Sequence, residues 1–108
     1  LGNCLLATQS DISGEYSIKE GTRLIDVSAF SHSELLTAIT IPSSVTTIEW
    51  GAFSYCTSLS TINYTGTMEQ WDKVIKGYNW NCNIPAKAAI CTDGCILLPK
   101  SDDDIFTF

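Results

Sequence analysis

Two stretches of the chain place hydrophobic and polar residues in nearly the same order. They are residues 29–41 (AFSHSELLTAITI) and 52–64 (AFSYCTSLSTINY), and they lie 23 positions apart. Within the first, Ile39 and Ile41 alternate with small or polar residues, which is typical of a half-buried β-strand. A further step of 23 towards the N-terminus places Ile41 on Ile18, so we expect an earlier strand there.

A repeat with a period in the low twenties predicts a solenoid. Each turn is too short to bury its own apolar face, so successive turns stack and share one core. We therefore expect a mostly-β solenoid of short stacked parallel strands. Its predicted core consists of Ala29, Phe30, Ile39, Ile41, Val45, Ile48, Ala52, Phe53, Leu59 and Ile62.

The 23-residue pattern is lost near residue 65, where the sequence predicts a helix instead. Residues 67–70 (TMEQ) match a capping box at a helix start. Trp71, Val74 and Ile75 then lie on one apolar face, and Gly77 is expected to end the helix.

Beyond this helix the sequence predicts a β-hairpin. Residues 88–91 and 95–98 are two short apolar runs around Thr-Asp-Gly, a typical turn. Helix and hairpin together would cover the open end of the solenoid. We expect one domain with four parts: a leading segment with a partial repeat (1–24), two 23-residue repeats (25–65), a helix–hairpin cap (66–99) and an acidic tail (100–108).

Charge and composition restrict the classes of partner. The 108 residues include twelve acidic and six basic side chains, for a net charge of −6. Contacts to nucleic acid phosphates need clustered Lys and Arg, so we expect no nucleic-acid partner. No apolar run approaches the roughly 20 residues of a membrane helix, and no signal peptide is recognisable in this segment.

Five cysteines leave at least one thiol without an intramolecular partner. Small buried thiols are the favoured interpretation. Two alternatives remain open: a short disulfide between Cys91 and Cys95, and a zinc site formed by the same pair with Cys82. The sequence does not decide the disulfide state of these three residues.

Candidate catalytic residues are few. The single histidine, His32, aligns with Tyr55 in the repeat and is expected in a surface loop. The three aspartates at 102–104 lack the spacing of a calcium loop. Trp50, Trp71 and Trp80 could stack on sugars, but Trp71 and Trp80 are better suited to the core of the cap. We predict no catalytic residue, no metal site and no cofactor, and therefore no enzyme.

The repeat unit carries a family resemblance. The stretch LTAITIPSSVTTIEWGAFSYCTSLSTINYTGT (36–67) resembles the BspA-like leucine-rich repeat family, whose members are mostly bacterial surface and secreted proteins. The segment that follows it is similar to the end of such arrays. The segment before it (3–25) is similar to a hairpin insert that often precedes a repeat run, which implies an entry hairpin within residues 1–24. The resemblance therefore covers roughly residues 3–97. One departure is Ser33, where the family usually has Cys. The resemblance implies a leucine-rich-repeat solenoid at the C-terminal end of a repeat array.

This resemblance also implies a function. It points to a protein–protein interaction or adhesion module of a cell-surface or secreted bacterial protein, located outside the cell, with a protein ligand on a host or neighbouring cell. The alternative is a non-catalytic spacer or end domain of a larger protein. Outward strand positions that recur every 23 residues form the candidate binding face: Glu15, Ser17, Ala38, Thr40, Thr61 and Asn63.

Overall fold

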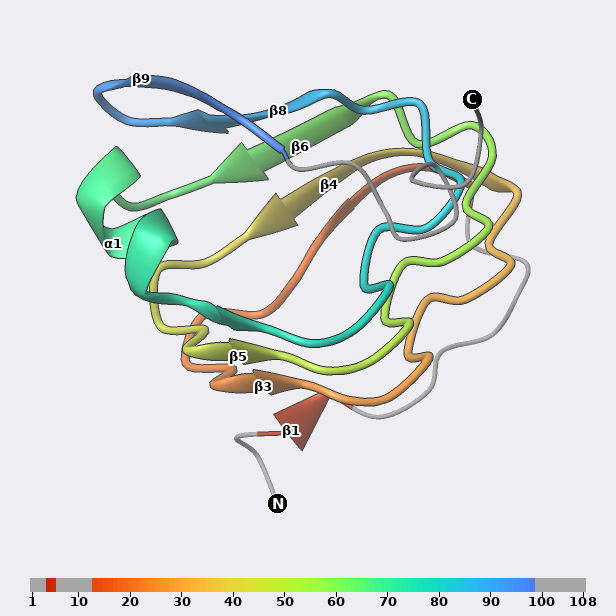
Figure 1. Cartoon of the computed structure of the whole chain (residues 1–108), viewed down its shortest axis with the longest axis horizontal. Helices are drawn as coiled ribbons and strands as arrows, with labels where there is room; N and C mark the ends of the chain where they lie inside the picture. The colour runs from red at the N-terminus through yellow and green to blue at the C-terminus, as the bar shows by residue number, and fades with distance from the viewer. Residues whose placement is uncertain (1–3, 6–12, 99–108) are drawn as a thin grey trace.

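The chain forms a solenoid whose stacked turns alternate between two sheets (Figure 1). The computed structural model describes residues 4–5 and 13–98. A narrow sheet of two-residue strands has the order β1 (Cys4–Leu5), β3 (Leu24–Ile25), β5 (Thr47–Ile48) and β7 (Ile75–Lys76). A wide sheet has the order β2 (Ser13–Ser17), β4 (Leu35–Ile41), β6 (Thr61–Tyr64), β8 (Ala88–Cys91) and β9 (Gly94–Leu97).

The predicted parallel solenoid is confirmed by the pairing of these strands. Neighbours are parallel throughout both sheets except for β8 and β9, which form an antiparallel hairpin. In the central turns Ile25 pairs with Ile48, and Ile39 pairs with Ile62. Both pairs are 23 residues apart, so the sequence period is the length of one turn.

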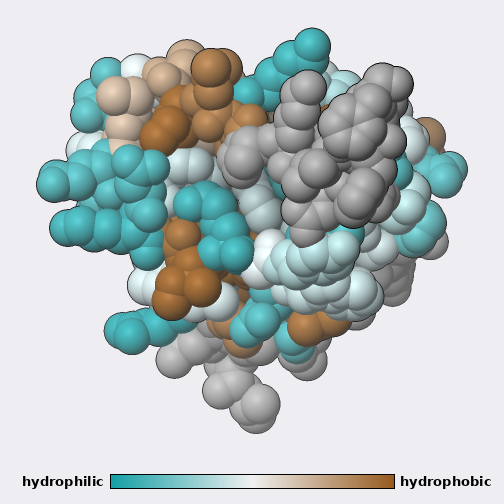
Figure 2. Space-filling model, viewed as in Figure 1, coloured by the Kyte–Doolittle hydropathy of each residue, from teal (hydrophilic) through white to brown (hydrophobic). Residues whose placement is uncertain are grey.

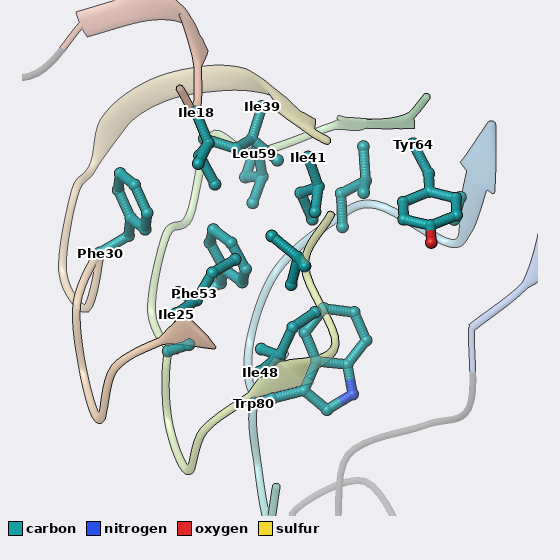
Figure 3. Close-up of a cluster of buried hydrophobic side chains, with 14 of the residues drawn as sticks. Ile18, Ile25, Phe30, Ile39, Ile41, Ile48, Phe53, Leu59, Tyr64 and Trp80 are labelled. Carbon is teal, nitrogen blue, oxygen red and sulfur yellow. The ribbon is translucent and has the colours of Figure 1, made fainter. Parts of the chain in front are cut away.

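The core lies between the two sheets (Figure 3). All ten predicted core residues are buried, and β4 and β6 contribute their inward-facing isoleucines. Pro42 follows the end of β4, where no ladder hydrogen bond from its nitrogen is required. Phe30 and Phe53 stack with ring centroids 5.2 Å apart and planes 8° apart. Equivalent side chains of successive turns therefore pack directly on one another.

The corners between the narrow and wide sheets use two left-handed residues per turn. Gly51, with φ of 66°, lies between Ser28 and Asn79 in one row, since Ser28 N donates to Trp50 O and Gly51 N to Tyr78 O. His32, Tyr55 and Asn83 form the second row, with φ between 58° and 63°. Five of these six positions are not glycine. The stacked turns therefore hold the backbone of these residues in the left-handed region, which residues other than glycine seldom adopt.

The solenoid continues past the point where the sequence pattern is lost, so the expected end of the array near residue 65 is wrong. Ile48 pairs with Lys76 in the narrow sheet, and Asn63 pairs with Ile90 in the wide sheet. The spacing is 28 in the first pair and 27 in the second. The pattern at 23 is lost because this last turn is longer and contains the helix.

The predicted helix is shorter than expected. Helix α1 spans Met68–Lys73 and has the predicted capping box at Thr67. Trp71 and Val74 are buried, but Ile75 is 67% exposed because it belongs to strand β7 rather than to the helix. The predicted helix end at Gly77 is therefore wrong.

The two predicted hairpins differ in outcome. The C-terminal hairpin is confirmed as β8 and β9, with Cys91 opposite Gly94, and its turn contacts α1 through a hydrogen bond from Met68 N to Asp93 Oδ1. The leading hairpin is wrong: β1 and β2 lie in different sheets, and each pairs in parallel with the following turn. The predicted acidic tail lies outside the described residues.

Candidate protein-binding surface

The six predicted site residues lie in two rows across the outer face of the wide sheet. Ser17, Thr40 and Asn63 are paired neighbours on β2, β4 and β6. The second row consists of Glu15, Ala38 and Thr61. The residues on β2 are exposed, and the other four are half-buried by their neighbours in the rows. The register thus brings the predicted residues together, and their role in binding remains a prediction.

The backing of this face is rigid. Between the outward residues of β4 and β6 lie inward ones, Ile39, Ile41 and Ile62, which are fully buried. An outward side chain therefore sits on a backbone that is fixed by both the ladder hydrogen bonds and the core. Only a small loss of backbone entropy is expected when such a surface binds another protein.

Repeat analysis missed an apolar end to this face. Ile90 continues the row of Asn63 and is 45% exposed, and the hairpin places Cys95 opposite Ile90. Figure 2 shows hydrophobic surface over the β8–β9 hairpin and hydrophilic surface over α1. A 23-residue register cannot find Ile90, because the last turn has a different length. Residues 88–91 are a continuous apolar run, so alternation of apolar and polar residues did not single out Ile90 either.

A small open cavity lies on the other side of β6, next to α1. Its volume is about 170 Å³, below the roughly 300 Å³ of small ligand pockets. The lining residues are Ser43, Val45, Thr46, Tyr64, Gln70, Lys73 and Val74. The pKa of Tyr64 is raised by burial and by the neighbouring Cys91, so its phenol stays protonated near neutral pH.

Cys56, Cys91 and Cys95 are free cysteines, and Cys82 is buried. Cys91 is buried and Cys95 is exposed, because adjacent hairpin positions point to opposite faces of the sheet. The disulfide alternative for this pair is therefore not realised. Among the described residues no group of three or more His, Cys, Asp or Glu side chains is arranged to hold a metal ion.

The buried thiol of Cys56 has a structural role in the turn. Its Sγ donates to the backbone carbonyl of Phe30 at 2.9 Å in the preceding turn. Burial raises the pKa of this thiol to about 11, with a smaller opposing contribution from a hydrogen bond to Ser33. A thiolate nucleophile is disfavoured in this environment.

The single histidine lies at the surface, as expected. His32 is exposed and stacks on Tyr55 at 5.0 Å between ring centroids.

The parallel turns, the outward rows and the buried isoleucine ladders together define a leucine-rich-repeat solenoid. A family model described as a BspA type leucine rich repeat region (6 copies) matches residues 9–84. The chain belongs to this BspA-type leucine-rich repeat family. Such a solenoid is typically a non-catalytic scaffold for protein interaction, and the family is generally found at the surface or secreted.

Comparison with individual proteins gave no further relatives. No curated protein and no solved structure matches the chain significantly. Within residues 4–5 and 13–98, α1 is far too short to cross a bilayer, and no other helix there could do so.

Proposed function

We propose that this chain is a protein-binding module that presents the outer face of its wide sheet to another protein. The observation that carries the proposal is the pair of rows formed by Glu15, Ala38 and Thr61 and by Ser17, Thr40 and Asn63. Short side chains on a flat, core-backed sheet offer a broad contact area without a deep pocket.

The chemistry of the face favours a protein over a small molecule. Glu15 is the one charged residue of the six, so a partner is recognised mainly by shape and by hydrogen bonds to hydroxyl and amide groups. Ile90 adds an apolar end to the row of Asn63. A mixed surface of polar residues around an apolar element resembles the composition of many protein interfaces.

The setting that fits this module is the surface of a bacterial cell, or secretion from it, with adhesion to a host or neighbouring cell as the outcome. Support comes from membership of a family that is generally surface-exposed or secreted. An antibody against the chain should label intact cells. Labelling that requires permeabilised cells would contradict this location.

The binding face is tested in two steps. The purified chain is used as bait to capture and identify a partner, and the affinity of the purified partner is then measured by calorimetry. Thr40→Arg and Asn63→Arg add bulk and charge to the face without touching the core, and each should weaken binding at least tenfold, or about 1.4 kcal/mol. Thr46→Arg is the matched control, because Thr46 is exposed beside the narrow sheet. Loss of binding in the Thr46 variant alone would place the ligand on the opposite wall.

A non-catalytic spacer is the second candidate function. Its support is that none of the six outward positions in the two rows carries a large apolar side chain to anchor a partner. A chain that captures no partner in the bait experiment, yet melts cooperatively, would favour the spacer.

A further inference from the structure

The corner between the two sheets carries large exposed side chains in register, away from the wide-sheet face. In one row Val27, Trp50 and Tyr78 occupy equivalent positions of three successive turns, and they are 46%, 50% and 58% exposed. In a second row His32 stacks on Tyr55, and both are exposed. We call these five residues the corner surface. Its three segments run side by side at the right of Figure 1.

The corner surface is held rigidly. Ser31 and Ser54 hydrogen-bond to each other between the two rows, at 3.2 Å between their hydroxyl oxygens. Gly77 lets the last turn approach, because a Cβ there would lie 2.6 Å from the backbone nitrogen of Trp50. Trp50 and Tyr78 are thus presented at fixed positions on adjacent turns. Aromatic residues held in this way are the commonest anchors of protein interfaces.

Negative charge flanks the aromatic row. Glu49 precedes Trp50, and in the ladder it lies next to Asp26, because Glu49 N donates to Ile25 O at 2.9 Å. Neighbouring residues of like charge on adjacent strands repel each other. No Lys or Arg occurs in residues 24–72 or in residues 77–86, which include both rows of the corner surface.

We propose that the corner surface binds a basic protein segment, with an Arg or Lys side chain over the rings of Trp50 and Tyr78 and its charge paired with Glu49. This inference builds on the proposed function as an interaction module and adds a second surface with a partner of defined charge. A guanidinium or ammonium group would gain from the aromatic face and from the carboxylate of Glu49 at the same time. A neutral glycan would use the rings but not the charge.

The test uses the whole chain and its three tryptophan indole N–H signals in NMR spectra. A synthetic peptide of alternating Arg and Gly is titrated, with a peptide of alternating Glu and Gly and with cellohexaose as comparison probes. We expect the arginine peptide alone to shift the signal of Trp50. Trp71 and Trp80 are buried, with exposures of 2% and 3%, and serve as internal controls whose signals stay in place. Added salt should weaken binding.

Variants make the proposal falsifiable. Trp50→Ala should weaken binding of the arginine peptide about tenfold or more, and Glu49→Gln about two- to fivefold. Trp50→Phe keeps a ring and should lose less, and Leu35→Ala, at an exposed position outside the corner surface, should change nothing. Unchanged binding by Trp50→Ala, equal binding of the glutamate peptide, or a Trp50 shift with cellohexaose but not with the arginine peptide would each overturn it.

The two proposals fail separately. Thr40→Arg and Asn63→Arg act on the wide-sheet face and should leave binding of the arginine peptide unchanged. If they abolish partner capture while the peptide fails to shift Trp50, the corner surface is refuted and the wide-sheet face stands. If the peptide binds through Trp50 and the face variants leave partner capture intact, the reverse holds.

Discussion

The turn that contains Phe53 and the turn that contains Trp80 are neighbours in the solenoid, yet they fill their interiors differently. Phe53 stacks face to face on Phe30, its equivalent one turn earlier. Trp80 contacts Phe53 edge-on, at 6.1 Å between centroids, and also contacts Trp71 at 5.9 Å. In the central turns, side chains of the same type stack on one another. In the last turn, side chains of other types occupy the end of the stack.

The exchange of residue types in the last turn has a physical reason. Phe53 N donates to Trp80 O as Phe30 N donates to Ala52 O, so Trp80 occupies the ladder position of Ala52. A large indole fits there because no further turn of the described solenoid stacks on that side. Asn81, one residue on, takes the position of Phe53.

Lys76 shows the same change in the narrow sheet, where it follows Ile48 in the ladder. Its Nζ donates to the carbonyls of Trp71 and Val74 at 2.8 and 3.0 Å, and it lies 4.6 Å from the centroid of the Trp71 ring. Burial lowers the pKa of this amine, opposed by the nearby Asp72. A lysine thus donates to two carbonyls at the end of α1, which an isoleucine could not do. The carbonyl of Trp71 also accepts from Val74 N, at 3.1 Å.

The largest expected effect comes from removing the side chain that joins the two kinds of turn. Phe53→Ala should lower the free energy of unfolding by about 3–5 kcal/mol, because it leaves a cavity between Phe30 and Trp80. Urea denaturation measures the change. Leu35→Ala, at a position 60% exposed, is the control and should stay within about 0.5 kcal/mol. A midpoint for Phe53→Ala equal to that of the unmodified chain would refute the stacked core.

A glycine substitution tests how closely the last turn approaches the central one. Gly77→Ala should cost about 1–3 kcal/mol in urea denaturation, because its Cβ would lie 2.6 Å from Trp50 N and 2.9 Å from the carbonyl carbon of Glu49.

The comparison variant is Gly51→Asn. Gly51 has a left-handed φ of 66°, and Asn79 adopts 54° in the same corner row, so an Asn suits this backbone. We expect Gly51→Asn to cost less than Gly77→Ala. The opposite order would mean that corner conformation, rather than contact between turns, limits stability.

Sequence reasoning succeeded where successive turns carry residues of the same kind. Ile39 and Ile62 are equivalent in type and in pairing, so the period, the core and the two outward rows could be predicted. It failed in the last turn for two reasons: α1 lengthens the turn and shifts the register, and Lys76 replaces an isoleucine. For the same reason the alignment of Trp50 with Tyr78 in the corner surface could not be found at a spacing of 23.

Helix α1 belongs to the last turn alone, and its cap offers a smaller test. The side chain of Thr67 accepts a hydrogen bond from Gln70 N at 3.2 Å, and Gln70 Oε1 accepts one from Thr67 N at 2.8 Å. Thr67→Ala should cost about 1 kcal/mol, and Thr67→Ser, which keeps the hydroxyl, much less. Hydrogen exchange should show the added loss of protection in α1 and not in β4. A uniform loss across both elements would mean that the helix is not an independent part of the last turn.

The smallest effect at neutral pH, and the most specific to the central turns, concerns Cys56. Its folded pKa of about 11 exceeds the ordinary value of 9.0, so the folded state holds the proton more tightly. The resulting stability is complete below about pH 9 and is lost as the pH rises towards about 11, since the unfolded chain then binds fewer protons.

The lowered pKa of Lys76 acts in the opposite direction, so the contribution of the thiol must be isolated by comparison with a variant. Cys56→Ser keeps a donor for the carbonyl of Phe30, as Ser33 occupies the equivalent position one turn earlier, but does not titrate. The difference in free energy of unfolding between the unmodified chain and Cys56→Ser should therefore move in favour of the variant between pH 9 and 11. A difference that stays constant over this range would show that the Cys56 thiol titrates alike in the folded and unfolded chain.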